Sequence, residues 1–155
     1  MTKLTTCNSR REATSIDTTM TQPVVISSDE IAQQPSEHFP DVRHGSGLNW
    51  KTLLSSSKTP TDTLTTGIAT CAPGNSLLCT HQHTHAEIYY VIRGSGVVEI
   101  EGKEFDVKEG SVVFIPSDAK HGVRNASGSE EFVWLYVFAA DGFGEVEYRF
   151  LTDGS

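Results

Sequence analysis

The sequence predicts an all-β protein built as one small domain. Beyond residue 60, short runs of Val, Ile, Leu, Phe and Tyr are interrupted about every eight to twelve residues by Gly, Pro, Asn or Asp. The chain has 155 residues, enough for a single domain whose core needs neither disulfides nor a structural metal. Many short strands on short connections favour a small sandwich or barrel whose edges are closed by strand pairing.

An extension is expected to precede this domain. Residues 1–22 are rich in Thr, Ser and charge and nearly lack large apolar side chains, so we predict that they are disordered. Residues 23–63 are expected to form an arm that contains one short helix, Ser28–Gln34. Ser28 is a suitable capping residue, helix formers follow it, and Pro35 stops the run.

The barrel is expected over residues 64–155. The turn sequences Arg93–Gly96 and Glu101–Lys103 supply glycine where a tight connection needs a positive φ. Just before the barrel, Trp50 and the Leu53-Leu54 pair fit either a helix or a strand that packs on it. The predicted strands are Leu64–Cys71, Ser76–His81, Glu87–Arg93, Gly96–Glu101, Lys103–Val107, Ser111–Ile115, His121–Asn125, Glu131–Ala139 and Glu145–Phe150.

Composition excludes several classes of partner. The formal charge of -8 and the lack of a basic stripe argue against nucleic acid as a ligand. The Arg10-Arg11 pair is not followed by an apolar stretch, so we expect neither a secretory signal nor a membrane anchor. Cys7, Cys71 and Cys79 form an odd set without a pairing motif, which favours a reducing compartment. We therefore expect a cytoplasmic protein.

Most of the candidate metal-binding side chains lie in one short run of the chain. His81, His83 and Glu87 offer two imidazoles and a carboxylate at the alternate positions of a strand, and His121 follows further along. These ligand types suit divalent first-row metals. His85 has the same spacing, so either a local bulge turns it away or it lies outside the ligand set. A solvated polar strand face is the alternative interpretation.

Two segments resemble the paired motifs of the cupin family, and the resemblance covers residues 64–140. The first is Gly74 with His81-x-His83-x-x-x-Glu87-x-x-x-x-x-x-Gly94, and the second is Gly110-x-x-x-x-x-Pro116-x-Asp118-x-x-His121-x-x-x-Asn125. Gly74 lies one residue further from His81 than is usual, and Asp118 stands where the family often has glycine. The resemblance implies a cupin barrel, also called a jelly roll or double-stranded β-helix. It also implies one metal ion bound by His81, His83, Glu87 and His121.

The sequence is also similar to the cupin-type dimethylsulfoniopropionate lyases. The similar stretches are Glu87–Ile92, Trp134–Asp141 and Glu145–Phe150. These bacterial enzymes split dimethylsulfoniopropionate into dimethyl sulfide and acrylate. The resemblance implies a divalent cofactor, Fe²⁺ in the first place, with Mn²⁺, Ni²⁺, Co²⁺ or Zn²⁺ as alternatives. It also implies that the tyrosine two residues after the metal-binding Glu, here Tyr89, takes part in catalysis.

The chemistry of such a reaction is consistent with these residues. A β-elimination needs a base for the proton α to the carboxylate, and Tyr89 becomes a credible base when a divalent cation favours its phenolate; otherwise it is a wall tyrosine with one hydrogen bond. A sulfonium group is attracted to aromatic faces, although large aromatic residues in strands more often serve ordinary core or interface packing. The aromatic candidates are Trp50, Tyr90, Trp134 and Tyr136, and Tyr90 faces away from Tyr89 by spacing. Cys79 shares the spacing of the ligands and is expected beside the site.

Two other functions remain open from the sequence. The same three-His, one-carboxylate set serves dioxygenases that act on small organic substrates. The chain could instead be a metal-bearing module that binds a small ligand without turnover. An exposed apolar sheet face in a small barrel would also allow a homodimer.

Overall fold

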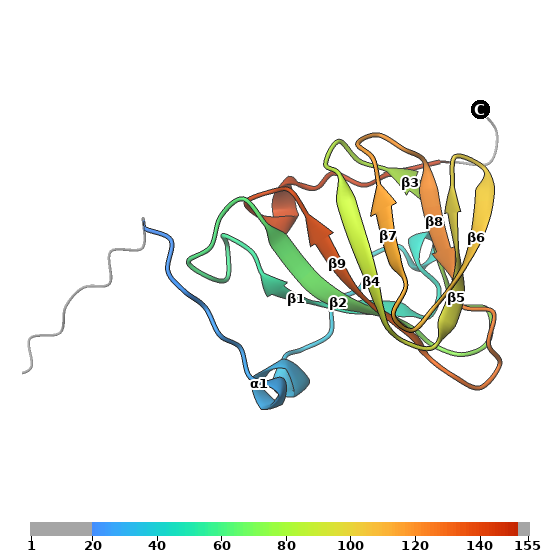
Figure 1. Ribbon diagram of the computed structural model, residues 1–155, viewed down its shortest axis with the longest axis horizontal. Helices are drawn as coiled ribbons and strands as arrows, with labels where there is room; N and C mark the ends of the chain where they lie inside the picture. Colours follow the sequence, from blue (N-terminus) through green and yellow to red (C-terminus); the bar gives the residue numbers. More distant parts are fainter. Residues whose placement is uncertain (1–19, 152–155) are drawn as a thin grey trace, which may run out of the picture.

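Two five-stranded antiparallel sheets form the body of the protein, with the strand orders β1-β2-β9-β4-β7 and β10-β3-β8-β5-β6 (Figure 1). The computed structural model describes residues 20–151. Of the segment predicted to be disordered, residues 1–19 lie outside this range. The inner faces of the two sheets carry the buried apolar side chains, so the core fills the space between them. This is the predicted all-β jelly-roll architecture.

The strand bounds agree closely with those expected from the sequence. Short apolar runs became strands, and the glycine-containing segments between them became turns. In the hairpin that joins β5 to β6, Glu101 and Gly102 have positive φ values of 51° and 76°. The strands are β1 Leu48–Leu54, β2 Thr65–Cys71, β3 Leu77–Gln82, β4 Glu87–Arg93, β5 Ser95–Ile100, β6 Lys103–Lys108, β7 Val112–Ile115, β8 His121–Arg124, β9 Phe132–Phe138 and β10 Arg149–Phe150.

Three segments differ from the prediction or settle an open alternative. The stretch that fitted a helix or a strand equally well is strand β1, which pairs along β2. The last predicted strand was too long, because Phe143–Glu145 forms a 3-10 helix and only Arg149–Phe150 pairs with β3. A second 3-10 helix, Val42–His44, was not predicted. Such short turns lack the periodicity that identifies longer elements.

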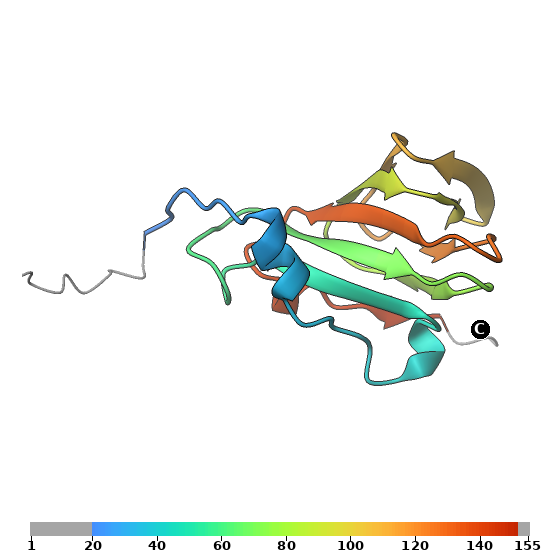
Figure 2. The ribbon, with the colours of Figure 1, turned by 90° about the horizontal axis from the view of Figure 1, so that it is seen from below.

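The N-terminal arm crosses the outside of the barrel and carries helix α1, Ser28–Gln33 (Figures 1 and 2). The capping residue is Ser27 rather than Ser28, and Ser27 forms a capping box with Glu30. Lys51 on β1 donates hydrogen bonds to the carbonyl oxygens of Ile31 and Ala32 at the end of the helix. The arm is therefore attached to the edge strand of the first sheet. No helix within residues 20–151 is long and apolar enough to cross a bilayer.

Candidate metal centre

Three histidines meet between the two sheets. His81 lies on β3 and His121 on β8, where the two residues are partners in the antiparallel register. His83 follows β3 in the connection to β4. One ligand atom from each of the three histidines lies within 4.8 Å of the other two, and all three residues are buried. Within the described residues, this group has the composition and the spacing to hold a metal ion.

The backbone selects the tautomer of each ring. The Nδ1 atoms of His81, His83 and His121 lie 2.8 to 2.9 Å from the carbonyl oxygens of Cys79, His85 and Ala119. A carbonyl oxygen can only accept, so Nδ1 carries the proton and donates in all three cases. The Nε2 atoms then present lone pairs to the interior. An outer hydrogen bond of this kind is typical of metal-binding histidines.

Glu87, the first residue of β4, lies beside two of the three histidines. Its Oε2 atom lies 3.3 Å from Nε2 of His83 and 3.3 Å from Nε2 of His121. None of these three atoms, nor Nε2 of His81, has a hydrogen-bond partner, and all are buried. Lone pairs that face one another in a buried space are unfavourable unless a cation lies among them. The donor set therefore fits a divalent ion, which would supply that positive charge.

Burial also favours the neutral form of His81. Removal from solvent lowers the pKa of His81 well below its ordinary value, and the neighbouring His121 lowers it further. A neutral imidazole is the form that binds a metal. The neutral ring of His81 can therefore bind a cation without first losing a proton.

His85 is separated from this cluster by a turn. The chain leaves β3 at Gln82 and enters β4 at Glu87, so the alternation of a single continuous strand does not extend across His85. Its backbone carbonyl accepts the hydrogen bond from His83 Nδ1. The expected conflict over His85 is resolved by the turn, which gives it a supporting place outside the three-histidine group.

Tyr89 points into the interior from β4, on the same face as Glu87. It is 3% exposed, and its ring lies 5.6 Å from that of Trp134. Burial raises the pKa of Tyr89 well above its ordinary value, and the charge of Glu87 and a hydrogen bond with it act in the same direction. The phenol is therefore protonated in the absence of a nearby cation.

A narrow aromatic cavity adjoins Tyr89 and Glu87. Of the sequence candidates for contact with a cation, Trp50, Trp134 and Tyr136 line this cavity. Tyr90 does not, because it lies on the outer face of β4 and is 47% exposed. The other side chains that line the cavity are Phe39, Leu48, Ala69, Leu78, Phe143 and Tyr148. The two aromatic residues Phe143 and Tyr148 come from the segment after β9.

Sequence reasoning did not assign Tyr148 to the site. Its ring stacks on His81 with centroids 4.7 Å apart and an angle of 23° between the planes. Burial raises the pKa of Tyr148 well above its ordinary value, and Glu87 raises it further. No regular spacing in the sequence relates residue 148 to the histidines. The one feature of the sequence that pointed to Tyr148 was its position in a stretch similar to the lyases.

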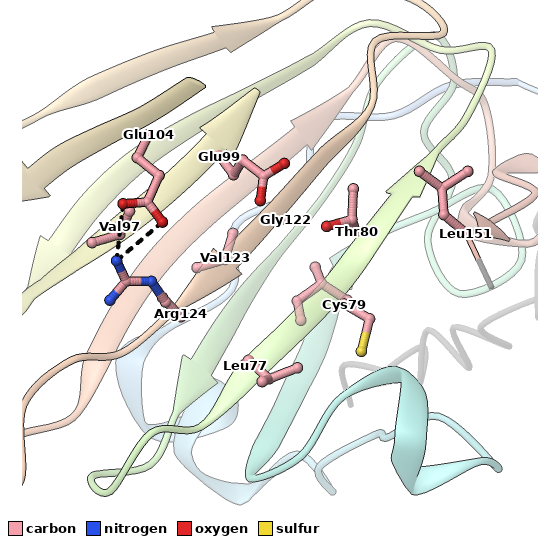
Figure 3. Close-up of a pocket in the computed structure, with 11 residues that line it drawn as sticks. Leu77, Cys79, Thr80, Val97, Glu99, Glu104, Gly122, Val123, Arg124 and Leu151 are labelled. Carbon is pink, nitrogen blue, oxygen red and sulfur yellow. Dashed lines mark hydrogen bonds and ion pairs between the residues drawn. The ribbon is translucent and has the colours of Figure 1, made fainter. Parts of the chain in front are cut away.

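Cys79 lies outside the metal site, contrary to the expectation. The pairing of β3 with β8 is irregular between Leu78 and His81, so the alternation of faces is broken there. The Cys79 side chain donates to the carbonyl oxygen of Arg43 and borders a pocket on the outer face of the second sheet (Figure 3). An ion pair between Arg124 and Glu104 borders the same pocket.

The jelly roll and its buried histidines are accompanied by a family match. The family model described as "Cupin domain" matches residues 67–138. Solved structures agree with this fold. The polyketide cyclase RemF of Streptomyces resistomycificus matches with a TM-score of 0.67 and 19% identity, covering 86% of this chain and 89% of RemF. A structure titled "Crystal structures of DMSP lyases RdDddP and RnDddQII" matches with a TM-score of 0.62 and 18% identity, covering 76% and 62% of the two chains.

Among curated proteins, the chain resembles dimethylsulfoniopropionate lyase DddW of Ruegeria pomeroyi. The two are 36% identical over 103 residues, which are 66% of this chain and 66% of DddW. The similarity thus extends over just under two thirds of the length of that relative.

Proposed function

We propose that the protein is a carbon–sulfur lyase that splits dimethylsulfoniopropionate into dimethyl sulfide and acrylate. In this proposal one divalent ion, Fe²⁺ in the first place, is held by His81, His83, Glu87 and His121, and Tyr89 is the general base. The observation that carries the proposal is the buried cluster of unpartnered Nε2 and carboxylate atoms beside Tyr89. The 36% identity to DddW supports this choice of substrate.

The reaction requires a defined movement of one proton and two electron pairs. The Tyr89 phenolate accepts the proton from the carbon α to the substrate carboxylate. The electrons of that C–H bond form the carbon–carbon double bond, and the C–S bond breaks with its pair remaining on sulfur. A bound divalent ion supplies Lewis-acid stabilisation of the carboxylate and favours the ionised phenol. Buried Tyr89 needs that help, because burial raises its pKa.

The aromatic cavity supports a methylated cation as the substrate. Trp50, Trp134 and Tyr136 line it, and a cation over an aromatic face gains about 0.5 to 2 kcal/mol. The apolar methyl groups of a sulfonium also suit an apolar wall. Glu87, which the proposal assigns to the metal, is the acidic residue among those that line the cavity, and the other lining side chains are uncharged.

The decisive test is anaerobic turnover of dimethylsulfoniopropionate by purified protein with and without added Fe(II). We expect equal amounts of acrylate, measured by chromatography, and of dimethyl sulfide, measured in the headspace, with both dependent on the metal. A product that forms only with O₂ would indicate a dioxygenase. Binding without any turnover would indicate a ligand-binding module.

A further inference from the structure

One row of paired residues crosses the inner face of the first sheet beside the cavity. Thr52 on β1 is the register partner of Gly67 on β2, Gly67 is the partner of Tyr136 on β9, and Tyr136 is the partner of Tyr89 on β4. The two tyrosines thus start from neighbouring positions. Both line the same cavity.

Gly67 provides the space into which Tyr136 extends. A Cβ atom at position 67 would overlap the hydroxyl and Cζ of Tyr136 and the backbone carbonyl oxygen of Lys51. The Tyr136 ring therefore lies directly over Gly67. Because β9 stands between β2 and β4, this ring extends away from Tyr89. The space beside Tyr89 is left to the cavity.

A chain of hydrogen bonds holds the ring in this position. The Thr52 hydroxyl donates to Glu37 Oε2 over 3.1 Å, so its oxygen is left to accept from the Tyr136 hydroxyl 3.2 Å away. Glu37 also accepts from the Thr52 backbone N–H, at 3.0 Å, and from Lys58 Nζ, at 2.6 Å. Partial burial acts to raise the pKa of Glu37, but the hydrogen bonds from Lys58 and Thr52 hold it below the ordinary value. An ionised Glu37 can only accept, which sets the direction of every bond in the chain.

The arrangement also separates the roles of the two tyrosines. Burial raises the pKa of Tyr136, and its proton is directed to Thr52, away from the cavity. Thr52 and Tyr136 are 2% and 4% exposed, so loss of the Thr52 hydroxyl leaves the buried Tyr136 hydroxyl without its acceptor. Tyr136 therefore offers the cavity a fixed ring, and Tyr89 offers it a hydroxyl.

We propose that Tyr136, anchored over Gly67 by Thr52 and Glu37, sets the width of the cavity beside Tyr89 and so determines which substrates fit. The proposal deepens the proposed lyase function and rests on it for the identity of the substrate. The proposal predicts an upper limit on the size of the alkyl groups that the onium ion can carry. We expect this limit to admit two methyl groups and to disfavour larger alkyl groups, which would compete with the anchored ring.

The test releases the ring without changing its size. Thr52→Val keeps the side-chain volume and removes the acceptor for Tyr136. For metal-loaded protein we expect KM for dimethylsulfoniopropionate to rise by roughly five- to tenfold, because the Tyr136 hydroxyl loses its acceptor, with kcat changed by less than about twofold. The diethyl homologue should lose at least as much again in kcat/KM, because a free ring narrows the cavity. Thr52→Ser, which keeps the hydroxyl, should restore parent values.

Two further variants separate this proposal from a general loss of structure. Tyr136→Phe should reproduce the Thr52→Val effect on KM, and the double variant should be no worse than Thr52→Val, because both changes remove the bond between Thr52 and Tyr136. Thr70→Val on the outer face of β2 and Tyr90→Phe on the outer face of β4 are the matched controls and should behave as the parent. Unchanged KM and unchanged preference between the two homologues in Thr52→Val would overturn the proposal.

A binding measurement distinguishes failure of this proposal from failure of the lyase function. The probe is the unreactive analogue 3-(trimethylammonio)propionate, titrated by calorimetry into metal-loaded parent and Thr52→Val protein. Weaker binding to the variant, together with no acrylate from the parent, would refute the lyase function and support the cavity proposal. Equal affinity for both proteins would refute the cavity proposal even if the parent is an active lyase.

Discussion

In each histidine of the candidate centre, the two ring nitrogens have different roles. Nδ1 donates to a backbone carbonyl, and Nε2 faces the interior without a partner. Glu87 Oε2 faces two of these atoms at 3.3 Å. At the scale of single residues, three imidazoles and one carboxylate therefore present buried acceptor atoms without partners, which a cation would satisfy.

Alanine substitution at His81, His83, Glu87 or His121 should lower bound metal well below the parent value. The fold should survive each change, because the main core is apolar and independent of the ion. The measurement is elemental analysis of purified protein, with circular dichroism to verify the fold. His85→Ala is the control and should retain metal, since it is the backbone of His85 that supports His83. Full metal retention in any two of the four variants would rule out this ligand set.

Tyr89→Phe should keep the metal and the fold but lose most of kcat. Removal of a positioned general base typically costs about 10²- to 10⁴-fold, whereas one neutral hydrogen bond is worth about a factor of ten at most. The rate of acrylate release by the parent should rise with pH as the phenol ionises, and the Phe variant should lose that dependence. Tyr90→Phe, on the adjacent residue but the outer face, is the control. If Tyr89→Phe turns over within a few-fold of the parent, the base lies elsewhere, and His85 is the next candidate.

At the scale of the elements, turns and irregular pairing decide which side chains reach the site. The turn between β3 and β4 places His83 in the cluster, and the irregular pairing near Leu78 sends Cys79 to the outer face. Asp118, which stands where the family often has glycine, has a positive φ of 60°. This is the left-handed region that favours glycine and that Asp tolerates better than most residues.

Gly94, in the hairpin from β4 to β5, should not tolerate a side chain. Its φ is 79°, and a Cβ there would overlap the backbone carbonyl oxygen of Glu131. We expect Gly94→Ala to lower the free energy of unfolding by about 1 to 3 kcal/mol, from backbone strain and displacement of the neighbouring chain. Gly128→Ala is the control, because a Cβ at position 128 meets nothing within 4 Å. Urea unfolding measures both, and equal midpoints for the two variants would contradict the prediction.

At the scale of the whole molecule, segments far apart in the sequence close the cavity. Phe39 comes from the arm, whereas Phe143 and Tyr148 follow β9, and the Phe39 and Tyr148 rings lie 5.3 Å apart. Glu37 joins the arm to β1 and, through Thr52, to Tyr136. The arm and the segment after β9 therefore both contribute side chains to the wall of the cavity.

The buried centre should make the metal-free protein sensitive to mild acid. The folded state lowers the pKa of His81 well below 6.5, so the unfolded chain binds more protons once the pH falls below that value. Stability from this group is present above about pH 6.5 and declines below it, by up to about 1.4 kcal/mol per pH unit. Urea midpoints measured from about pH 5 to 8 should show this decline, and His81→Gln should flatten it. His38→Gln, at an exposed histidine, is the control, and an equal slope in His81→Gln would contradict the account.

Much of the fold could be predicted because its signals are local. Alternating apolar residues and glycine turns identify strands whatever the rest of the chain does, and the bounds of β4 were predicted to the residue. The segment after β9 was predicted less well, since Phe143–Glu145 is a 3-10 helix with no periodic pattern. The stretch that became β1 carries no decisive pattern of its own, and its pairing with β2 decides its structure.

The sequence by itself determined the class of fold and the residues that can bind a metal, because ligand chemistry and strand spacing are properties of short segments. Only the tertiary structure decided which of those residues meet. It separated His85 and Cys79 from the cluster, brought Tyr148 onto His81, and laid Tyr136 over Gly67. These placements depend on strand pairing and on contacts between distant segments, and a pattern along one strand contains no information about either.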